Sequence, residues 1–367
     1  QSTGANTVQC IAYTKADGTG VVSAGGGGSV TNLIVNGGFN IAQRAKSFTA
    51  GSTIFLNSLT FYDLDQWILL SEGNDIVDVT RETDVFTGHR HSIKLDVETA
   101  SKKFGILQII ESPYAENIIG DTCSLTFTAK VNNAGAGRLD NIKAVVLSWD
   151  GTADTVTSDV VSAWGAEDTT PTWAANWTAE NTPANLSITT SQAAYTIENI
   201  SIDTASTRNV ALFIWADGLT GTVTDTLEIT GVQLEQGTSA NTLQPIDITK
   251  EYLRSCRYGY LFQGASSLSN TYSYGKNQGT TIADFGIPMP VPQRGITPTV
   301  TFMSTSDLGI LDEAGLHNPS SNSITNITFE DQANMFSARA NNYTGLTPSA
   351  GVVFQFNTGG IFIATEL

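Results

Sequence analysis

The sequence predicts an all-β protein: a jelly-roll β-sandwich, followed by a short helix and a second, smaller β domain. Charged residues make up only 14% of the 367 residues, against about 25% in an ordinary soluble domain. Small polar residues, threonine above all, take their place. Threonine is β-branched and favours strands, whereas helical surfaces usually carry Glu, Lys and Arg. Because 40% of the residues are hydrophobic, we expect a folded chain of about two domains.

Residues 1–31 are expected to form an N-terminal attachment segment that ends in a Gly-rich linker. Two short apolar stretches, Ile11–Tyr13 and Val21–Val22, flank an Asp-Gly turn signal and could pair as a small hairpin. Gly25–Gly28 then predicts a flexible joint. A segment of this size cannot fold alone, so we expect it to dock on something larger.

Residues 32–246 contain short runs of period-two character that turn residues interrupt at regular intervals. This spacing is typical of an antiparallel sandwich or jelly roll rather than of βαβ units. The expected strands include Ser92–Val97, Ser124–Val131, Ile142–Leu147, Asn209–Trp215 and Thr226–Leu234. From Asp150 to Tyr195 the chain is instead rich in Thr, Ala, Asp and Asn, and we expect long loops and short strands over one side of the sandwich.

Residues 247–259 are expected to form a linker helix. Asp247 is a suitable N-cap, and Arg254 and Arg257 favour the C-terminal end of a helix. Residues 260–367 return to strands and turns and predict a C-terminal β domain. A run of prolines over residues 288–298 predicts an extended, edge-like segment. The expected strands are Thr299–Met303, Ile324–Phe329, Met335–Ala340, Val352–Phe356 and Gly360–Ala364.

The formal net charge of −17 excludes several classes of partner. Nucleic acid requires clustered basic groups that neutralise phosphates, and the sequence has no basic run. Attraction to anionic lipid is disfavoured for the same reason, and no apolar run approaches the ~20 residues of a membrane span. The three cysteines are far apart and form neither a disulfide framework nor a metal-binding pair. We therefore expect a neutral, weakly charged or cationic partner, without nucleic acid and without membrane insertion.

Several motifs, in a fixed order, resemble carbohydrate-binding-module-like domains of bacteriophage virion proteins. The resemblance begins at Asn32–Asn40 (NLIVNGGFN) with Gln43-Arg44, and continues with Asp65-Gln66-Trp67 and a strand like His91–Val97. Further along, it rests on three segments: Trp173–Leu186, Ile229–Gly237 and Cys256–Tyr258. The segment PMPVPQRGITPTV, residues 288–300, is similar to phage tail-fibre and appendage proteins.

The resemblance implies a jelly roll, and some relatives bind sugars on aromatic platforms. Many relatives also carry a structural calcium, held by acidic side chains at an NGxFE opening and a closing DDV segment. Here the matching positions are Asn40 and Thr230-Gly231-Val232. The carboxylates that Ca²⁺ prefers are missing from both places, so the sequence offers no ligand set for calcium there, and we expect no cofactor.

Trp164, Trp173 and Trp177 are the candidate ligand-binding residues, because they lie among small polar residues. An indole ring can stack on the C–H face of a sugar and donate a hydrogen bond through its N–H. The alternative is packing in the core or between subunits. For Trp67 and Trp215, each inside an apolar run, we expect core packing.

Other candidate sites are weaker. His89 and His91 would share a face of a strand, and three such pairs around a threefold axis could bind a transition metal; we expect no metal there. Asp63 and Asp65 could approach each other as glycosidase carboxylates do, but Asp65 belongs to the Asp-x-Trp motif. The sequence contains no GxSxG, HExxH or GxxxxGK[ST] motif. We expect no catalytic residues and no enzyme.

The resemblance, together with the Trp-rich loops, implies a virion fibre or appendage protein that binds host cell-surface glycans during adsorption. The N-terminal segment would attach it to other virion proteins, and we expect a homotrimer because tail fibres and spikes usually are trimeric. The alternative is a structural head-fibre, decoration or tail-tip protein without receptor binding.

Overall fold

A computed structural model describes most of the chain beyond residue 31. The chain divides into two compact units, Gln1–Thr31 and Asn32–Leu367. The first unit lies outside the described residues, and so do the expected hairpin and linker within it. The described residues are 32–43, 47–48, 65–73, 75–134, 138–139, 141–204, 206–218, 222–241, 243–244, 247–263, 270–294, 298–302, 308–321, 323–328, 335–356 and 360–365.

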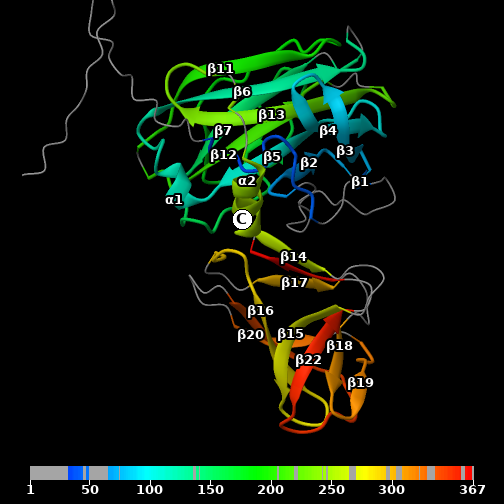
Figure 1. The fold of residues 1–367 in the computed structure, drawn as a ribbon. Coiled ribbons are helices and arrows are strands. Elements are labelled where there is room, and N and C mark those ends of the chain that lie inside the picture. Colours follow the sequence, from blue (N-terminus) through cyan, green and yellow to red (C-terminus); the bar gives the residue numbers. More distant parts are fainter. Residues whose placement is uncertain are drawn as a thin grey trace, which may run out of the picture. The chain divides into compact units, whose positions relative to one another are not determined.

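Two antiparallel sheets form the predicted jelly-roll sandwich (Figure 1). The six-stranded sheet has the order β1 (Ser47–Phe48), β3 (Val77–Phe86), β4 (His89–Val97), β13 (Thr226–Gln236), β6 (Thr122–Val131) and β11 (Ala193–Ser201). The five-stranded sheet has the order β10 (Trp177–Ala179), β7 (Ile142–Trp149), β12 (Asn209–Ala216), β5 (Phe104–Ile110) and β2 (Ile68–Ser71). Each of the five strands expected in this region lies within one of these strands.

Side-chain alternation along the strands produces two apolar layers. On β12, Val210, Leu212 and Ile214 face the space between the sheets and join the main core. The neighbouring residues Phe213 and Trp215 point to the opposite side of the sheet, where they belong to a second buried cluster. All eight residues of β12 are buried, so the five-stranded sheet is covered on both faces. This explains why β12 is a continuous apolar run rather than an alternating one.

The chain itself covers the outer face of the five-stranded sheet. The segment between β7 and β11 contributes the short strands β8 (Val161–Ala163) and β9 (Thr172–Trp173), which pair with each other. Val160, Val161 and Trp177 from this segment are buried against the outward side chains of β7 and β12. The expectation of long loops and short strands over one side of the sandwich is confirmed.

The opening NGGF motif packs against the closing segment of the sandwich. The backbone N–H of Val232 donates to the carbonyl of Gly37, and a Cβ atom on Gly37 would lie 2.1 Å from the Val232 carbonyl oxygen. Asn36 is fully buried; its side chain accepts from the Ile41 N–H and donates to the Ile41 and Asp65 carbonyls. The glycine is therefore required by close backbone approach.

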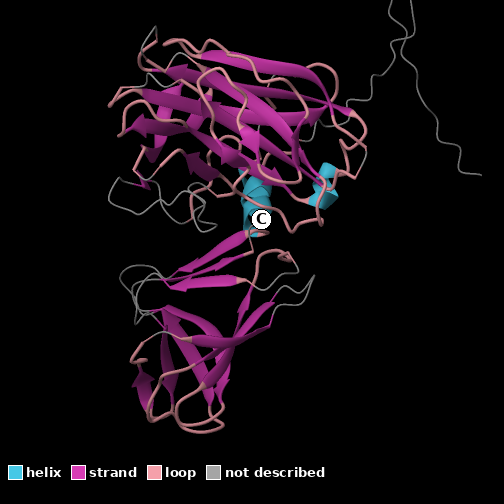
Figure 2. Cartoon of the chain, turned by 180° about the vertical axis from the view of Figure 1, so that it is seen from behind, coloured by secondary structure: helices cyan, strands magenta, loops and turns pink. Residues whose placement is uncertain are grey.

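Strands dominate the described residues, which contain two helices (Figure 2). The first, α1 (Ser112–Ala115), is a single turn after β5. The second, α2 (Ile248–Cys256), is the predicted linker helix, and the Asp247 carboxylate caps it by accepting from the backbone N–H groups of Thr249 and Lys250. Neither of these two described helices reaches the length and apolarity of a membrane span.

Helix α2 is attached to the opening motif by side-chain hydrogen bonds. The Glu251 carboxylate accepts from the backbone N–H of Asn36, and burial raises the pKa of Glu251 while Arg254 opposes that rise. Arg254 also donates to the Asn32 carbonyl at 3.0 Å. Gln43 continues the attachment, because its amide donates to Gly259 and accepts from the N–H of Leu261. Segments that the sequence shows as separate motifs thus meet at one place.

The C-terminal β domain consists of a seven-stranded and a three-stranded sheet. The larger has the order β19 (Gly315–His317), β18 (Leu308–Asp312), β22 (Gly351–Phe356), β15 (Asn270–Asn277), β16 (Ala283–Pro288), β21 (Met335–Ala340) and β20 (Ile324–Thr328). The smaller has the order β14 (Gly259–Gln263), β23 (Gly360–Ala364) and β17 (Thr299–Phe302). The two share one apolar cluster that includes Phe336, Phe354 and Ile363.

The strands expected in this domain are confirmed within the described residues, although Met303 and Phe329 lie outside them. The last strand, β23, is the central strand of the smaller sheet and pairs on both sides. The proline-rich segment was expected to be edge-like, but its first residue, Pro288, belongs to an interior strand. It ends β16, which pairs with both β15 and β21. Proline has no backbone N–H to donate to a neighbouring strand, and Pro288 is the residue at which β16 ends.

Candidate functional site

The three candidate tryptophans lie in the layer that covers the outer face of the five-stranded sheet. Phe213 and Trp215 stack with ring centroids 5.2 Å apart and planes at 5°. Trp173 meets both rings edge to face, at 6.5 and 6.1 Å, and Trp164 lies 5.9 Å from Phe213. Trp164 and Trp173 are half-buried. We call the rings of Trp164, Trp173, Phe213 and Trp215 the tryptophan layer.

Trp177 lies in a second aromatic pair beside this layer. It is 5% exposed and packs against Trp149 with ring centroids 5.1 Å apart. Its indole N–H donates to the Thr157 carbonyl at 2.9 Å, and that of Trp149 donates to the Thr152 carbonyl at 3.0 Å. The face and the N–H of Trp177 are therefore engaged within the chain.

A buried charge network anchors the loop that carries Trp164. Asp217, the residue directly after β12, accepts from Lys103 Nζ at 2.7 Å and from Lys143 Nζ at 2.6 Å. Burial raises the pKa of Asp217, but the hydrogen bonds from the two lysines, the charge of Lys103 and the backbone N–H of Asp168 together outweigh it, and the net direction is down. Lys103 also donates to the Trp164 and Ala166 carbonyls. Both charges of the Lys103–Asp217 pair are fully buried, so this network fixes the loop against the sheet.

The structure therefore brings Trp164 and Trp173 together over Phe213 and places Trp177 apart from them in a buried pair. Only the solvent-facing part of the Trp164 and Trp173 rings is accessible to a ligand. The assignment of these three residues to ligand binding stays a prediction. Trp67 and Trp215 are both fully buried in apolar clusters, as expected: Trp67 in the main core and Trp215 in the cluster on the outer side of the five-stranded sheet.

The remaining candidates have structural partners. His91 Nδ1 lies 3.3 Å from both the Thr83 hydroxyl and the Glu82 carbonyl, and burial lowers the pKa of His89. Asp65 accepts from the backbone and side-chain amides of Gln43, while Asp63 lies outside the described residues. Within the described part of the chain, no group of three or more His, Cys, Asp and Glu side chains could hold a metal ion.

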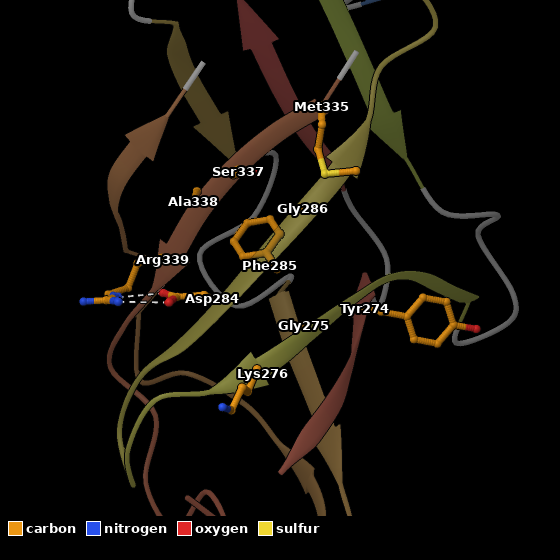
Figure 3. A pocket seen from close by; sticks show the side chains of 10 residues that line it. All are labelled: Tyr274, Gly275, Lys276, Asp284, Phe285, Gly286, Met335, Ser337, Ala338 and Arg339. Carbon is orange, nitrogen blue, oxygen red and sulfur yellow. Dashed lines mark hydrogen bonds and ion pairs between the residues drawn. The ribbon is translucent and has the colours of Figure 1, made fainter. Parts of the chain in front are cut away.

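A groove of about 420 Å³ lies on the seven-stranded sheet of the C-terminal domain (Figure 3). Strands β15, β16 and β21 line it side by side. Its lining residues are Tyr274, Gly275, Lys276, Asp284, Phe285, Gly286, Met335, Ser337, Ala338 and Arg339. We call it the β15–β21 groove.

Tyr274 and Met335 are the exposed apolar side chains of the β15–β21 groove. Tyr274 is 77% exposed and Met335 is 51% exposed; Figure 3 shows them on different strands of the lining. Between these strands, Gly286 lies on β16 next to the Met335 side chain: a Cβ atom there would lie 2.9 Å from Met335 Sδ. The hydroxyl of the buried Ser273 donates to the Gly286 carbonyl, which fixes β16 against β15.

A row of charged side chains crosses the same face of the sheet. Lys276 pairs in register with Asp284, and Asp284 with Arg339, so all three point to one side. Arg339 donates to both carboxylate oxygens of Asp284, at 2.6 and 2.9 Å. These hydrogen bonds lower the pKa of Asp284 and raise that of Arg339. The groove thus combines an exposed aromatic ring with donors and an acceptor.

Analysis of the sequence did not single out this groove. The segment TYSYGKN alternates in part, but it is short and polar, and nothing local shows which neighbours β15 has. The usable signals are two aromatic residues in a polar run and a glycine in each of the neighbouring strands β15 and β16. These residues form a groove only because β21, which begins more than 50 residues after the end of β15, pairs with β16.

No known family model matches this sequence. A search of curated proteins likewise found no relative.

Several solved structures share a weak likeness with the chain. The enzymatically active domain of tailspike protein 4 of bacteriophage CBA120 is 16% identical, with a TM-score of 0.33; the match covers 56% of this chain and 21% of the tailspike chain. A structure titled for carbohydrate-binding module CBM4 is 11% identical, with a TM-score of 0.29, over 55% of this chain and 98% of its own. A tandem of CBM22 modules from Paenibacillus barcinonensis Xyn10C is 13% identical, with a TM-score of 0.28, over 88% of this chain and 100% of its own. At these values the comparisons assign no function to this chain.

Proposed function

We propose that this chain is an adhesin of a bacteriophage virion, a fibre or appendage protein that binds host-surface glycans during adsorption. The observation that carries the proposal is Tyr274, the most exposed large apolar side chain among the described residues. Aromatic faces suit the C–H face of a sugar ring, and Lys276, Ser337 and the Asp284–Arg339 pair supply hydrogen-bonding groups along the same groove. The placement in a virion is supported by the ordered motifs that resemble phage proteins.

The β15–β21 groove suits a ligand better than the tryptophan layer does. Trp173 and Trp164 already use part of their surface against Phe213 and Trp215. The face of Tyr274, in contrast, is free in the described structure. A binding site that is exposed and formed by neighbouring strands is also held rigidly, so the ligand meets a preformed surface.

Weak contacts at single grooves would add up in an oligomer. Protein–sugar contacts of this size are individually weak, and several linked copies can raise avidity by roughly 10²–10⁴ without any new contact. We propose the homotrimer and the attachment to other virion proteins from the resemblance to phage fibre proteins, and a trimer would supply this avidity. We also propose that the chain binds glycans without cleaving them.

One observation favours the structural alternative. Leu316, Leu311, Val353 and Tyr274 lie in one cross-strand row over β19, β18, β22 and β15. Leu316 is 49% and Leu311 39% exposed. An exposed apolar row of this kind is also what an assembly interface requires. The alternative predicts that Tyr274 is covered by another subunit or another virion protein.

The test is competitive adsorption with purified full-length protein. Protein is added to host cells before the phage, and unadsorbed phage is counted. We expect the wild type to block adsorption in a saturable manner and Tyr274→Ala to lose that block while keeping its thermal stability and oligomeric state. Tyr114→Ala, at an exposed tyrosine on α1 outside the groove, is the matched control and should behave as wild type.

Three results would contradict the proposal or a part of it. If folded wild-type protein neither binds cells nor blocks phage, the chain is better described as virion architecture. If Tyr274→Ala changes the oligomeric state instead of cell binding, the groove is an assembly surface. New reducing ends in host polysaccharide incubated with the protein would contradict binding without cleavage.

A further inference from the structure

We infer that the β15–β21 groove selects saccharides that carry an acidic substituent, with Lys276 as the residue that determines this specificity. The inference rests on the proposed function and names the ligand class of the same site. Its basis is the relative placement of Tyr274, Lys276 and the Asp284–Arg339 pair.

Tyr274 and Lys276 are two residues apart on β15 and share one face. Residues at this spacing lie roughly 7 Å apart along a strand, which is close to the width of one sugar ring together with its substituent. A saccharide that stacks on Tyr274 and extends along β15 would bring an exocyclic group within reach of the flexible Lys276 side chain. Figure 3 shows both side chains on β15, with the Tyr274 ring and the Lys276 amine directed toward opposite ends of the strand.

Lys276 is the cation of the groove whose charge is not compensated. Arg339 is held by both oxygens of Asp284, so that pair is neutral as a unit. Lys276 is exposed, and among the described residues it forms no ion pair within 4.0 Å, even though Asp284 is its register partner. Asp284 is already engaged by Arg339, and the local charge of the lining is therefore +1.

This local charge opposes the charge of the whole chain. The net charge of −17 predicts a neutral or cationic partner, but exposed charges further apart than about 8 Å are largely screened at physiological ionic strength. A bound ligand in the groove therefore experiences Lys276 and its immediate neighbours more than the distant carboxylates. Lysine acts here as a point charge that can bind a carboxylate or a phosphate group, so the shared chemistry is an anionic substituent on a sugar.

The experiment compares matched immobilised oligosaccharides: galacturonate with galactose oligomers for the carboxylate, and phosphorylated with unmodified mannose oligomers for the phosphate. Full-length wild type, Lys276→Gln, Lys276→Arg and the control Lys250→Gln, an exposed lysine on α2, are measured at low and high salt. We expect binding to at least one acidic member, about fivefold weaker for Lys276→Gln and weaker at high salt. Lys276→Arg and Lys250→Gln should retain the preference. The same proteins are tested for adsorption to host cells.

The outcomes separate this inference from the proposed function. If Tyr274→Ala abolishes adsorption to cells but Lys276→Gln adsorbs as wild type does at both salt concentrations, the acidic ligand is wrong and glycan binding through the groove stands. If the wild type binds acidic and neutral oligosaccharides equally well, the acidic ligand is likewise wrong and glycan binding through the groove stands. If the wild type binds neither cells nor oligosaccharides, the proposed function itself is overturned.

Discussion

Trp173 meets Trp215 edge to face, with ring centroids 6.1 Å apart and ring planes at 86°. Trp173 belongs to β9, in the segment between β7 and β11, whereas Trp215 is part of β12 in the five-stranded sheet. The contact therefore attaches a surface segment to the sandwich. It gives the tryptophans a structural role that can be measured independently of any ligand.

We expect Trp177→Ala to destabilise the protein by about 3–5 kcal/mol, because a buried indole is replaced by a cavity. Trp173→Ala should cost less, since that ring is half-buried. Equilibrium unfolding in denaturant, followed by tryptophan fluorescence and circular dichroism, measures both. A stable Trp173→Ala protein that no longer binds cells would instead support the sugar-platform role.

Asp217→Asn should lower the free energy of unfolding by about 3–5 kcal/mol at neutral pH, because two buried lysines lose their shared carboxylate. The exposed Asp150→Asn is the matched control. The comparison is made by denaturant unfolding at pH 7.

The same aspartate predicts a pH dependence. The pKa of Asp217 is lower in the folded protein than in the unfolded chain, where it is about 3.9. Its contribution to stability is therefore present above that unfolded value and is lost as pH falls through the lower folded value. The difference in unfolding free energy between wild type and Asp217→Asn should be constant from pH 5 to 7 and should become smaller in strong acid. An equal gap at pH 2 and pH 7 would show that the ionised carboxylate is not responsible.

Glu111 joins the sandwich to the segment after α2. It accepts from Arg257 at 2.7 and 2.8 Å and from the Tyr258 hydroxyl at 3.1 Å, and buried Arg294 lies 3.6 Å away. We expect Glu111→Gln to separate the unfolding of the sandwich from that of the C-terminal domain in differential scanning calorimetry. The exposed Glu116→Gln on the same turn is the control. An unchanged thermogram for Glu111→Gln would contradict this role.

Gly37→Ala should destabilise the protein by about 1–3 kcal/mol, because the added Cβ would lie 2.1 Å from the Val232 carbonyl oxygen and force the backbone apart. Gly351→Ala, where a Cβ meets nothing within 4 Å, is the control and should be nearly neutral. Thermal unfolding of both variants gives their melting temperatures, and we expect a lower value for Gly37→Ala than for Gly351→Ala. Equal melting temperatures would mean that the NGGF turn can shift without cost.

The sequence predicted those helices and strands whose signals lie within a few neighbouring residues. The alternation in Ser124–Val131 predicted β6, and Asp247 with the following residues predicted α2 and its N-cap. Strand β15 was not predicted, because its short polar sequence acquires a buried face only from β22 and β16 on either side. The tryptophans were recognised as a group, but their polar neighbours in the sequence did not indicate the apolar surface of β12 beneath them.

The sequence by itself determined the all-β class, the linker helix and the order of sandwich and C-terminal domain. Period-two alternation, turn residues and helix capping act over a few residues, so they can be read along the chain. Only the tertiary structure decided which aromatic rings are buried and which stay exposed. It buried Trp177 against Trp149 and left Tyr274 open beside Lys276, because exposure depends on which strands pair and on what the chain places over each face.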